Sequence, residues 1–165
     1  MQTDSPDLIR QCESLAQALK TRGWTMAAAE SCTGGLIAAT CTGLSGSSDW
    51  FERGFVTYSN ASKTEQLGVA AELIATQGSV SEPVARAMAL GALTHSRAQV
   101  SVAVTGVAGP TGGSPDKPVG LVWFGWAIQG QAWTECRRFD GDRDAVRAAT
   151  VRHALQGLLE RLPHG

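Results

Sequence analysis

The chain has 165 residues, of which 43% are hydrophobic and 18% are charged, and its formal net charge is −1. This length and composition predict one well-packed domain covering residues 1–165 and argue against disorder. No run of Lys or Arg is present, which argues against nucleic acid as a partner. The start lacks the pattern of a signal peptide, and no apolar run approaches the roughly 18–20 residues of a membrane span. We therefore expect a cytoplasmic protein.

The four cysteines also indicate a reducing compartment. They stand at positions 12, 32, 41 and 136, without a Cys-x-x-Cys pair and without a His partner at metal-ligand spacing. Structural disulfides are rare in the cytoplasm, and zinc sites require closely spaced ligands. We expect free thiols, no metal and no cofactor.

Helical and strand patterns alternate along the first part of the chain. Residues 7–22 have apolar side chains at helical spacing, with Gly23 as the natural stop, and Thr25–Ala29 has the pattern of a short buried strand. The turn Glu30–Gly35 opens a second helix that continues to about Thr42. After a loop of small residues, Ser48 is placed to cap a short turn, and Phe55–Ser59 is a second strand candidate.

The second part repeats this alternation. Residues 60–78 have a helical pattern broken by glycine, and Glu82-Pro83 begins a helix that runs to about Arg97. Val100–Thr105 is the clearest strand, and a loop rich in glycine and proline follows it. Two further strands, Gly120–Ile128 and Gln131–Phe139, flank a hairpin signal, and residues 142–162 form the last helix. Five strands among helices predict an α/β layer fold.

Three loops are candidates for a ligand site because each follows a predicted strand. They are Glu30–Gly35, Ser59–Lys63 and Thr105–Gly113. If the three strands run parallel, their carboxyl ends meet at one edge of the sheet, where ligands bind in open α/β folds. The first loop opens a helix and could bind an anion through backbone N–H groups, although a capped helix without a ligand is the more common explanation of such a loop. The chain has neither a P-loop nor a dinucleotide-binding fingerprint.

Tyr58 and Lys63 are the most informative side chains. Tyr58 is the only tyrosine and Lys63 is one of three lysines, against eleven arginines. A buried lysine can lose its proton and act as a base, and tyrosine can relay a proton. The three histidines lie outside the candidate loops, so serine–histidine chemistry is disfavoured. Taken alone, however, a Tyr-x-x-x-x-Lys spacing fits an ordinary strand and helix as well.

Longer motifs, taken in order, resemble the CinA C-terminal domain family. The stretches that carry the resemblance are Ala29–Gly35, Gly46–Ser48, Val56–Asn60 with Lys63, Gly78–Ser81, Val104–Pro110, Gly112-Gly113, Lys117–Gly120 and Phe139–Arg143. The resemblance covers nearly the whole chain. The resemblance implies a three-layer α/β/α sandwich with a mixed five-stranded sheet. It also implies hydrolysis of the nicotinamide carboxamide of nicotinamide mononucleotide (NMN), in pyridine nucleotide salvage, by a homodimer or other homo-oligomer.

The resemblance further implies a set of site residues. Carried over by position, the catalytic serine falls on Ser48, the tyrosine on Tyr58 and the lysine on Lys63. We expect the substrate to be bound by hydroxyl groups, glycine-rich turns and arginines, namely Ser31, Thr33, Gly34, Thr105, Gly106, Gly109, Arg143 and Arg147. Both arginines could equally belong to a solvated helix start.

Two alternative functions remain open on the sequence. The first is a nucleotide-binding, competence-associated module without catalytic activity. The second is an amidase or esterase with the same catalytic residues and another substrate.

Overall fold

The computed structural model describes residues 5–163, which form one mixed five-stranded sheet. The strands are β1 (Met26–Glu30), β2 (Phe51–Val56), β3 (Val100–Gly106), β4 (Leu121–Ile128) and β5 (Gln131–Arg138), in the order β2-β1-β3-β4-β5. β1 runs parallel to β2 and β3, whereas β4 is antiparallel to β3 and β5. The predicted α/β class and its mixed sheet are confirmed, and the three strands that precede the candidate loops are parallel.

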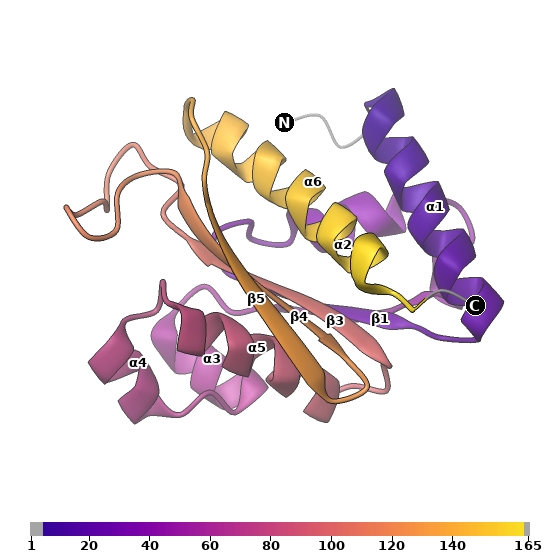
Figure 1. Cartoon of the computed structure of the whole chain (residues 1–165), viewed down its shortest axis with the longest axis horizontal. Coiled ribbons are helices and arrows are strands. Elements are labelled where there is room, and N and C mark those ends of the chain that lie inside the picture. The colour runs from indigo at the N-terminus through magenta and orange to yellow at the C-terminus, as the bar shows by residue number, and fades with distance from the viewer. Residues whose placement is uncertain (1–4, 164–165) are drawn as a thin grey trace.

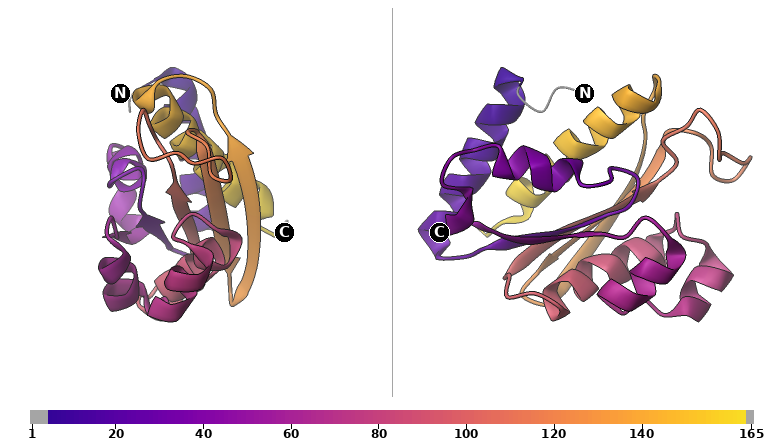
Figure 2. Two further views of the ribbon diagram at one scale, coloured as in Figure 1. Left: turned by 90° about the vertical axis from the view of Figure 1, so that its left-hand side faces the viewer. Right: turned by 180° about the vertical axis from the view of Figure 1, so that it is seen from behind.

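Helices cover both faces of this sheet. One face carries α1 (Pro6–Arg22), α2 (Leu36–Thr42) and α6 (Arg143–Arg161), as Figure 1 shows. The other face carries α3 (Asn60–Leu67), α4 (Ala71–Gln77) and α5 (Glu82–Thr94). The turned views in Figure 2 show the same two groups and the loop between β3 and β4, which projects from one end of the sheet.

The sequence of the central strands explains the two layers. In β3, Val100, Val102 and Val104 pack toward α1 and α6, while Ala103 packs toward α5. A parallel strand that is covered on both faces has apolar residues at nearly every position. Small residues on the α5 side let that helix lie close to the sheet: a Cβ at Gly125 would stand 2.4 Å from the carbonyl oxygen of Ala85.

The first helix has the ends that its sequence predicts. The Ser5 hydroxyl accepts a hydrogen bond from the Leu8 N–H, and Gly23 ends the helix with a φ of 68°. A left-handed residue at this position favours glycine because a side chain would be strained there. Strand β1 therefore starts where the sequence analysis placed it, to within one residue.

Strand β2 is the element that the sequence analysis placed least well. It begins at Phe51, four residues before the predicted start, and ends at Val56, so Tyr58 lies beyond it. The short turn that Ser48 was predicted to cap is a single 3-10 turn, Ser47–Asp49, which contains Ser48, is capped by Gly46 and is followed directly by strand. β2 is an edge strand whose faces are partly exposed, so it can contain the charged residues Glu52 and Arg53. These residues interrupt the alternation of apolar and polar side chains by which a strand is predicted.

Two helix predictions also change. The broken helical segment 60–78 is two helices, α3 and α4, separated at Gly68, whose φ is 71°. Helix α5 ends at Thr94 instead of Arg97. Within residues 5–163, no helix is both long and apolar enough to cross a bilayer.

Candidate active site

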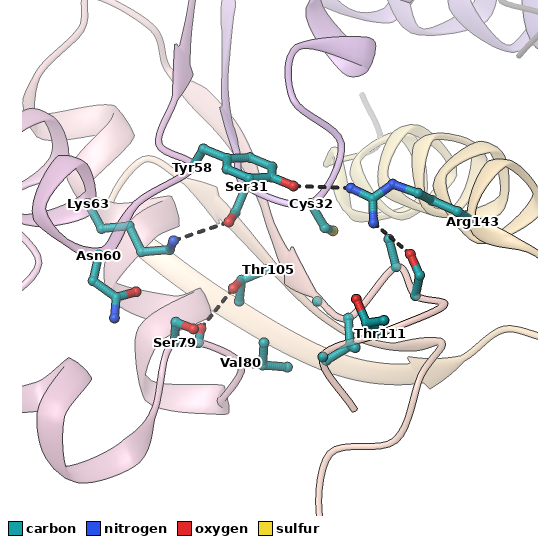
Figure 3. A pocket seen from close by; sticks show the side chains of 15 residues that line it. Ser31, Cys32, Tyr58, Asn60, Lys63, Ser79, Val80, Thr105, Thr111 and Arg143 are labelled. Carbon is teal, nitrogen blue, oxygen red and sulfur yellow. Dashed lines mark hydrogen bonds between the residues drawn. The ribbon is translucent and has the colours of Figure 1, made fainter. Parts of the chain in front are cut away.

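A cavity of about 380 Å³ lies at the carboxyl ends of β1, β2 and β3. Its walls come from the three predicted loops, together with the loop before α5 and the first residue of α6. The side chains labelled in Figure 3 are Ser31, Cys32, Tyr58, Asn60, Lys63, Ser79, Val80, Thr105, Thr111 and Arg143. The convergence expected from strand direction is confirmed.

Lys63 and Ser31 meet inside this cavity. The Nζ atom of Lys63 lies 3.1 Å from Oγ of Ser31 and donates to the carbonyl oxygen of Thr57 at 3.0 Å. Lys63 is 1% exposed although it is one of the longest side chains in the protein. Helix α3 places it there, because Ser59 caps the helix and Lys63 lies one turn inside. Figure 3 shows the amine pointing at the serine hydroxyl.

The surroundings of Lys63 favour its neutral form. Burial lowers its pKa below the ordinary value of 10.5, and the neighbouring Cys32 thiol opposes this shift in part. A neutral amine can donate one N–H to the Thr57 carbonyl and turn its lone pair to the Ser31 hydroxyl. A serine and a desolvated lysine at hydrogen-bond distance can act as a nucleophile and its base.

Tyr58 and Arg143 occupy the mouth of the cavity. The side chain of Tyr58 is exposed, and its hydroxyl oxygen accepts a hydrogen bond of 3.1 Å from the Arg143 guanidinium. Arg143 also donates to the carbonyl oxygen of Gly109 at 2.7 Å. The Tyr58 hydroxyl points toward Arg143 and away from Lys63 (Figure 3). The described residues that line the cavity include the cation Arg143 and no carboxylate, which suits an anionic ligand.

Ser48 lies elsewhere. It is an exposed residue of the 3-10 turn before β2, whereas Tyr58 and Lys63 follow the carboxyl end of that strand. The six residues of β2 separate the two ends by about 20 Å at about 3.3 Å per residue. Within the described chain, the structure does not bring Ser48 to Tyr58 and Lys63. The resemblance supplied Ser48 by motif order alone, which carries no information about the direction of β2.

The predicted binding residues fall into two groups. Ser31, Thr105, Gly106, Gly109 and Arg143 line the cavity. The hydroxyl of Thr105 donates to the carbonyl oxygen of Ser79 at 2.8 Å, which leaves its lone pairs as acceptors.

Thr33, Gly34 and Arg147 lie behind the cavity wall. The Arg147 guanidinium donates to the carbonyl oxygens of Cys32 and Thr33, at 3.2 and 3.1 Å. Gly34 has a φ of 58° and leaves room for this guanidinium, which would lie 3.5 Å from a Cβ at that position. These residues shape the turn that presents Ser31 and do not face the cavity.

The sequence analysis missed part of the site. Asn60, Ser79 and Val80 line the cavity. They lie in the stretches Val56–Asn60 and Gly78–Ser81 that carry the family resemblance, but the sequence analysis gave these three residues no role in the site. The thiol of Cys32 lines it as well, but burial raises its pKa to about 12, so it is not an activated nucleophile.

Comparison with known proteins identifies the family. The sequence model of the CinA C-terminal domain matches residues 10–162. The chain belongs to the CinA C-terminal domain family. It is 52% identical to the nicotinamide-nucleotide amidohydrolases PncC of Shigella flexneri and of Escherichia coli strain K12, over 96% of this chain and of each relative. The resemblance stated from the motifs is therefore confirmed.

Other CinA-family relatives are longer. A CinA-like protein of Syntrophobacter fumaroxidans is 48% identical over 86% of this chain, which corresponds to 33% of that protein. Among solved structures, the competence/damage inducible protein CihA of Agrobacterium tumefaciens superposes with a TM-score of 0.93 at 44% identity, covering 97% of this chain and 98% of that one. A CinA superfamily protein of Escherichia coli superposes with a TM-score of 0.90 at 38% identity, covering 97% and 92%.

Proposed function

We propose that this protein hydrolyses the carboxamide of NMN to give nicotinate mononucleotide and ammonia. Two observations support the proposal together. Relatives that are 52% identical over nearly the full chain are nicotinamide-nucleotide amidohydrolases. The cavity holds a buried serine–lysine pair at one end and an arginine at its mouth. The Ser31–Lys63 contact carries the proposal, because it supplies the chemistry that an amide requires.

Ser31 is the nucleophile in this account, in place of Ser48. Its Oγ attacks the carboxamide carbon, and its proton passes to the neutral amine of Lys63. The tetrahedral intermediate collapses when the C–N bond breaks, and Lys63 returns the proton to the leaving nitrogen, which departs as ammonia. Water then attacks the ester of Ser31, with Lys63 again taking a proton, and releases the carboxylic acid and the free serine.

Backbone amides are available for the developing oxyanion. The Ser31 N–H donates to the carbonyl oxygen of Val104, so it is occupied. Arg147 donates a hydrogen bond to the carbonyl oxygen of Cys32. Because the peptide between Cys32 and Thr33 is planar and trans, the Thr33 N–H points away from Arg147. The Cys32 N–H follows the nucleophile directly. We assign the oxyanion to the amides of this turn, where fixed donors stabilise charge more than water does.

The mouth of the cavity binds the phosphate. Arg143 can form two parallel hydrogen bonds to a phosphate, and the exposed Tyr58 hydroxyl adjoins it. NMN then spans the cavity with its carboxamide at Ser31 and its phosphate at Arg143. This replaces the expected role of Tyr58 as a proton relay, because its hydroxyl faces Arg143. The reaction belongs to pyridine nucleotide salvage, and homo-oligomer formation remains a prediction.

The test is incubation of the purified protein with NMN, with ammonia and nicotinate mononucleotide measured together. Equal amounts of the two products support the proposal. Binding of NMN by calorimetry without any product would favour the nucleotide-binding module instead. Hydrolysis of other amides or esters but not of NMN would indicate a different substrate for the same pair.

A further inference from the structure

Glu30 is a fully buried carboxylate directly before the proposed nucleophile, and the proposed reaction does not use it. It is 0% exposed. Its Oε1 accepts hydrogen bonds from the Thr33 hydroxyl at 2.6 Å and from the Ile37 N–H at 2.8 Å. Its Oε2 accepts from the Ala38 N–H at 3.0 Å. A buried carboxylate is costly unless donors surround it, and here three donors satisfy both oxygens.

The Glu30 carboxylate caps helix α2 although Glu30 lies outside that helix, at the end of β1. Helix α2 begins after Gly35, which has no side chain to cap it. Glu30 accepts hydrogen bonds from the N–H groups of Ile37 and Ala38, the second and third residues of the helix. A capping side chain ordinarily binds the N–H groups at these positions. The end of β1 is thereby tied to the start of α2 across the intervening turn, Ser31–Gly35.

The main chain of Glu30 is also connected to Lys63, through hydrogen bonds of Thr57. Its carbonyl oxygen accepts the Thr57 N–H at 2.8 Å, and the Thr57 carbonyl oxygen in turn accepts from the Lys63 amine at 3.0 Å. One residue therefore holds the turn that carries Ser31 and the strand end that orients the base. Its side chain lies behind the cavity and is absent from the residues that line it.

We infer that Glu30 and Thr33 are positioning residues, whose hydrogen bond sets the conformation of the turn that presents Ser31 to Lys63 and to the substrate. The inference rests on the proposed role of Ser31. A displacement of about 1 Å at a reacting group can lower a rate on the order of 10²-fold, while the contacts that bind the rest of the substrate persist. Loss of the hydrogen bond should therefore lower kcat and leave KM nearly unchanged.

The experiment compares Thr33→Val, Thr33→Ser and Glu30→Gln with the unaltered protein. Valine keeps the shape of threonine but removes the donor, serine keeps the donor, and glutamine replaces one acceptor oxygen by a donor that faces the Ala38 N–H. Ser101→Ala is the matched control, because the Ser101 hydroxyl is 0% exposed and donates to the Ala89 carbonyl oxygen on the other face of the sheet. Each protein is assayed for kcat, KM and thermal unfolding, and for the rate at which a fluorophosphonate labels Ser31.

We expect Thr33→Val to lower kcat and the labelling rate at least about tenfold with KM within about twofold, and Thr33→Ser to restore most of both. Glu30→Gln should lose more, and Ser101→Ala should lose stability without losing kcat. Should Glu30→Gln fail to fold, the two Thr33 variants decide. Turnover and labelling of Thr33→Val equal to the unaltered protein would overturn the inference alone. Absence of both signals in the unaltered protein would overturn the proposed function and the inference with it.

Discussion

The amine of Lys63 lies 3.1 Å from the hydroxyl of Ser31, although 32 positions separate them in the chain. The two residues belong to different parts of the fold: Ser31 follows strand β1, and Lys63 projects from the first turns of helix α3. The parallel pairing of β1 and β2 brings their carboxyl ends together, which makes this contact a product of the topology. Burial of the amine beside the serine then gives the pair its chemistry.

The first prediction concerns Lys63 and pH. Because burial lowers the pKa of Lys63, the neutral amine becomes available below pH 10.5, and kcat should rise with pH through this lowered pKa and then level off. Below that pKa the amine is protonated and unable to take the serine proton. The measurement is kcat for NMN across pH, with folding checked at each value.

Substitution of Lys63 provides the companion test. Lys63→Arg keeps a cation but removes the base, because a guanidinium does not lose its proton in proteins. We expect at least about a 10²-fold loss of kcat, the lower range that general-base catalysis contributes. A Lys63→Arg enzyme with the activity and pH profile of the unaltered protein would rule out lysine as the base.

Arg143 is predicted to act on binding. Arg143→Ala removes the guanidinium that faces the mouth of the cavity, so KM for NMN should rise at least about tenfold, which corresponds to a lost charge-assisted hydrogen bond of about 1.5 kcal/mol or more. A substrate without phosphate, nicotinamide riboside, should be affected much less. Equal effects on both substrates would place the phosphate elsewhere.

Tyr58→Phe tests whether the tyrosine relays protons. Its hydroxyl contacts Arg143 and not Lys63, so removal of the hydroxyl should raise KM a few-fold and leave the pH profile of kcat in place. A large loss of kcat with a changed pH profile would restore the relay that the sequence analysis proposed.

Arg147 lies one helical turn after Arg143 but has another role. Since its guanidinium binds the carbonyl oxygens of Cys32 and Thr33, Arg147→Met should lower kcat more than it raises KM, the reverse of Arg143→Ala. The same assays on both variants make the comparison direct. An Arg147→Met enzyme that differs only in KM for NMN would instead indicate contact with the substrate.

A stability prediction follows from the packing of α6 on the sheet. Replacement of glycine by alanine inside a helix ordinarily stabilises by roughly 0.5–1 kcal/mol. At Gly157, however, a Cβ would stand 2.2 Å from the ring of Trp126, which is buried. Gly157→Ala should therefore destabilise by about 1–3 kcal/mol, as overpacked cores do. Urea unfolding measures this, with the exposed Arg152→Ala on the same helix as a control.

The extent to which the sequence predicted the structure differs between elements. The central strands and the three converging loops could be predicted, because Val100–Thr105 and its neighbours are mostly apolar and are followed by turns of small polar residues and glycines. Strand β2 was misplaced because an edge strand needs apolar side chains at only some positions.

The site residues also differ in how far the sequence predicted them. Lys63 stood out by its rarity and Ser31 by its place in a turn after a buried strand, but their contact depends on a hydrogen bond between distant segments. Motif order favoured Ser48 as the nucleophile, whereas strand direction sends it to the opposite end of β2 from the cavity. The capping role of Glu30 was not predicted, because a carboxylate that caps a helix from the preceding strand has no characteristic spacing in the sequence.

The most direct test of this account is ammonia release from NMN by Ser31→Ala and Ser48→Ala, measured side by side with the unaltered protein. Both variants remove one hydroxyl, and both should fold. We predict that Ser31→Ala loses turnover by at least about 10³-fold while still binding NMN, and that Ser48→Ala retains nearly full activity. An active Ser31→Ala protein beside an inactive, folded Ser48→Ala protein would contradict the account and return the nucleophile to Ser48.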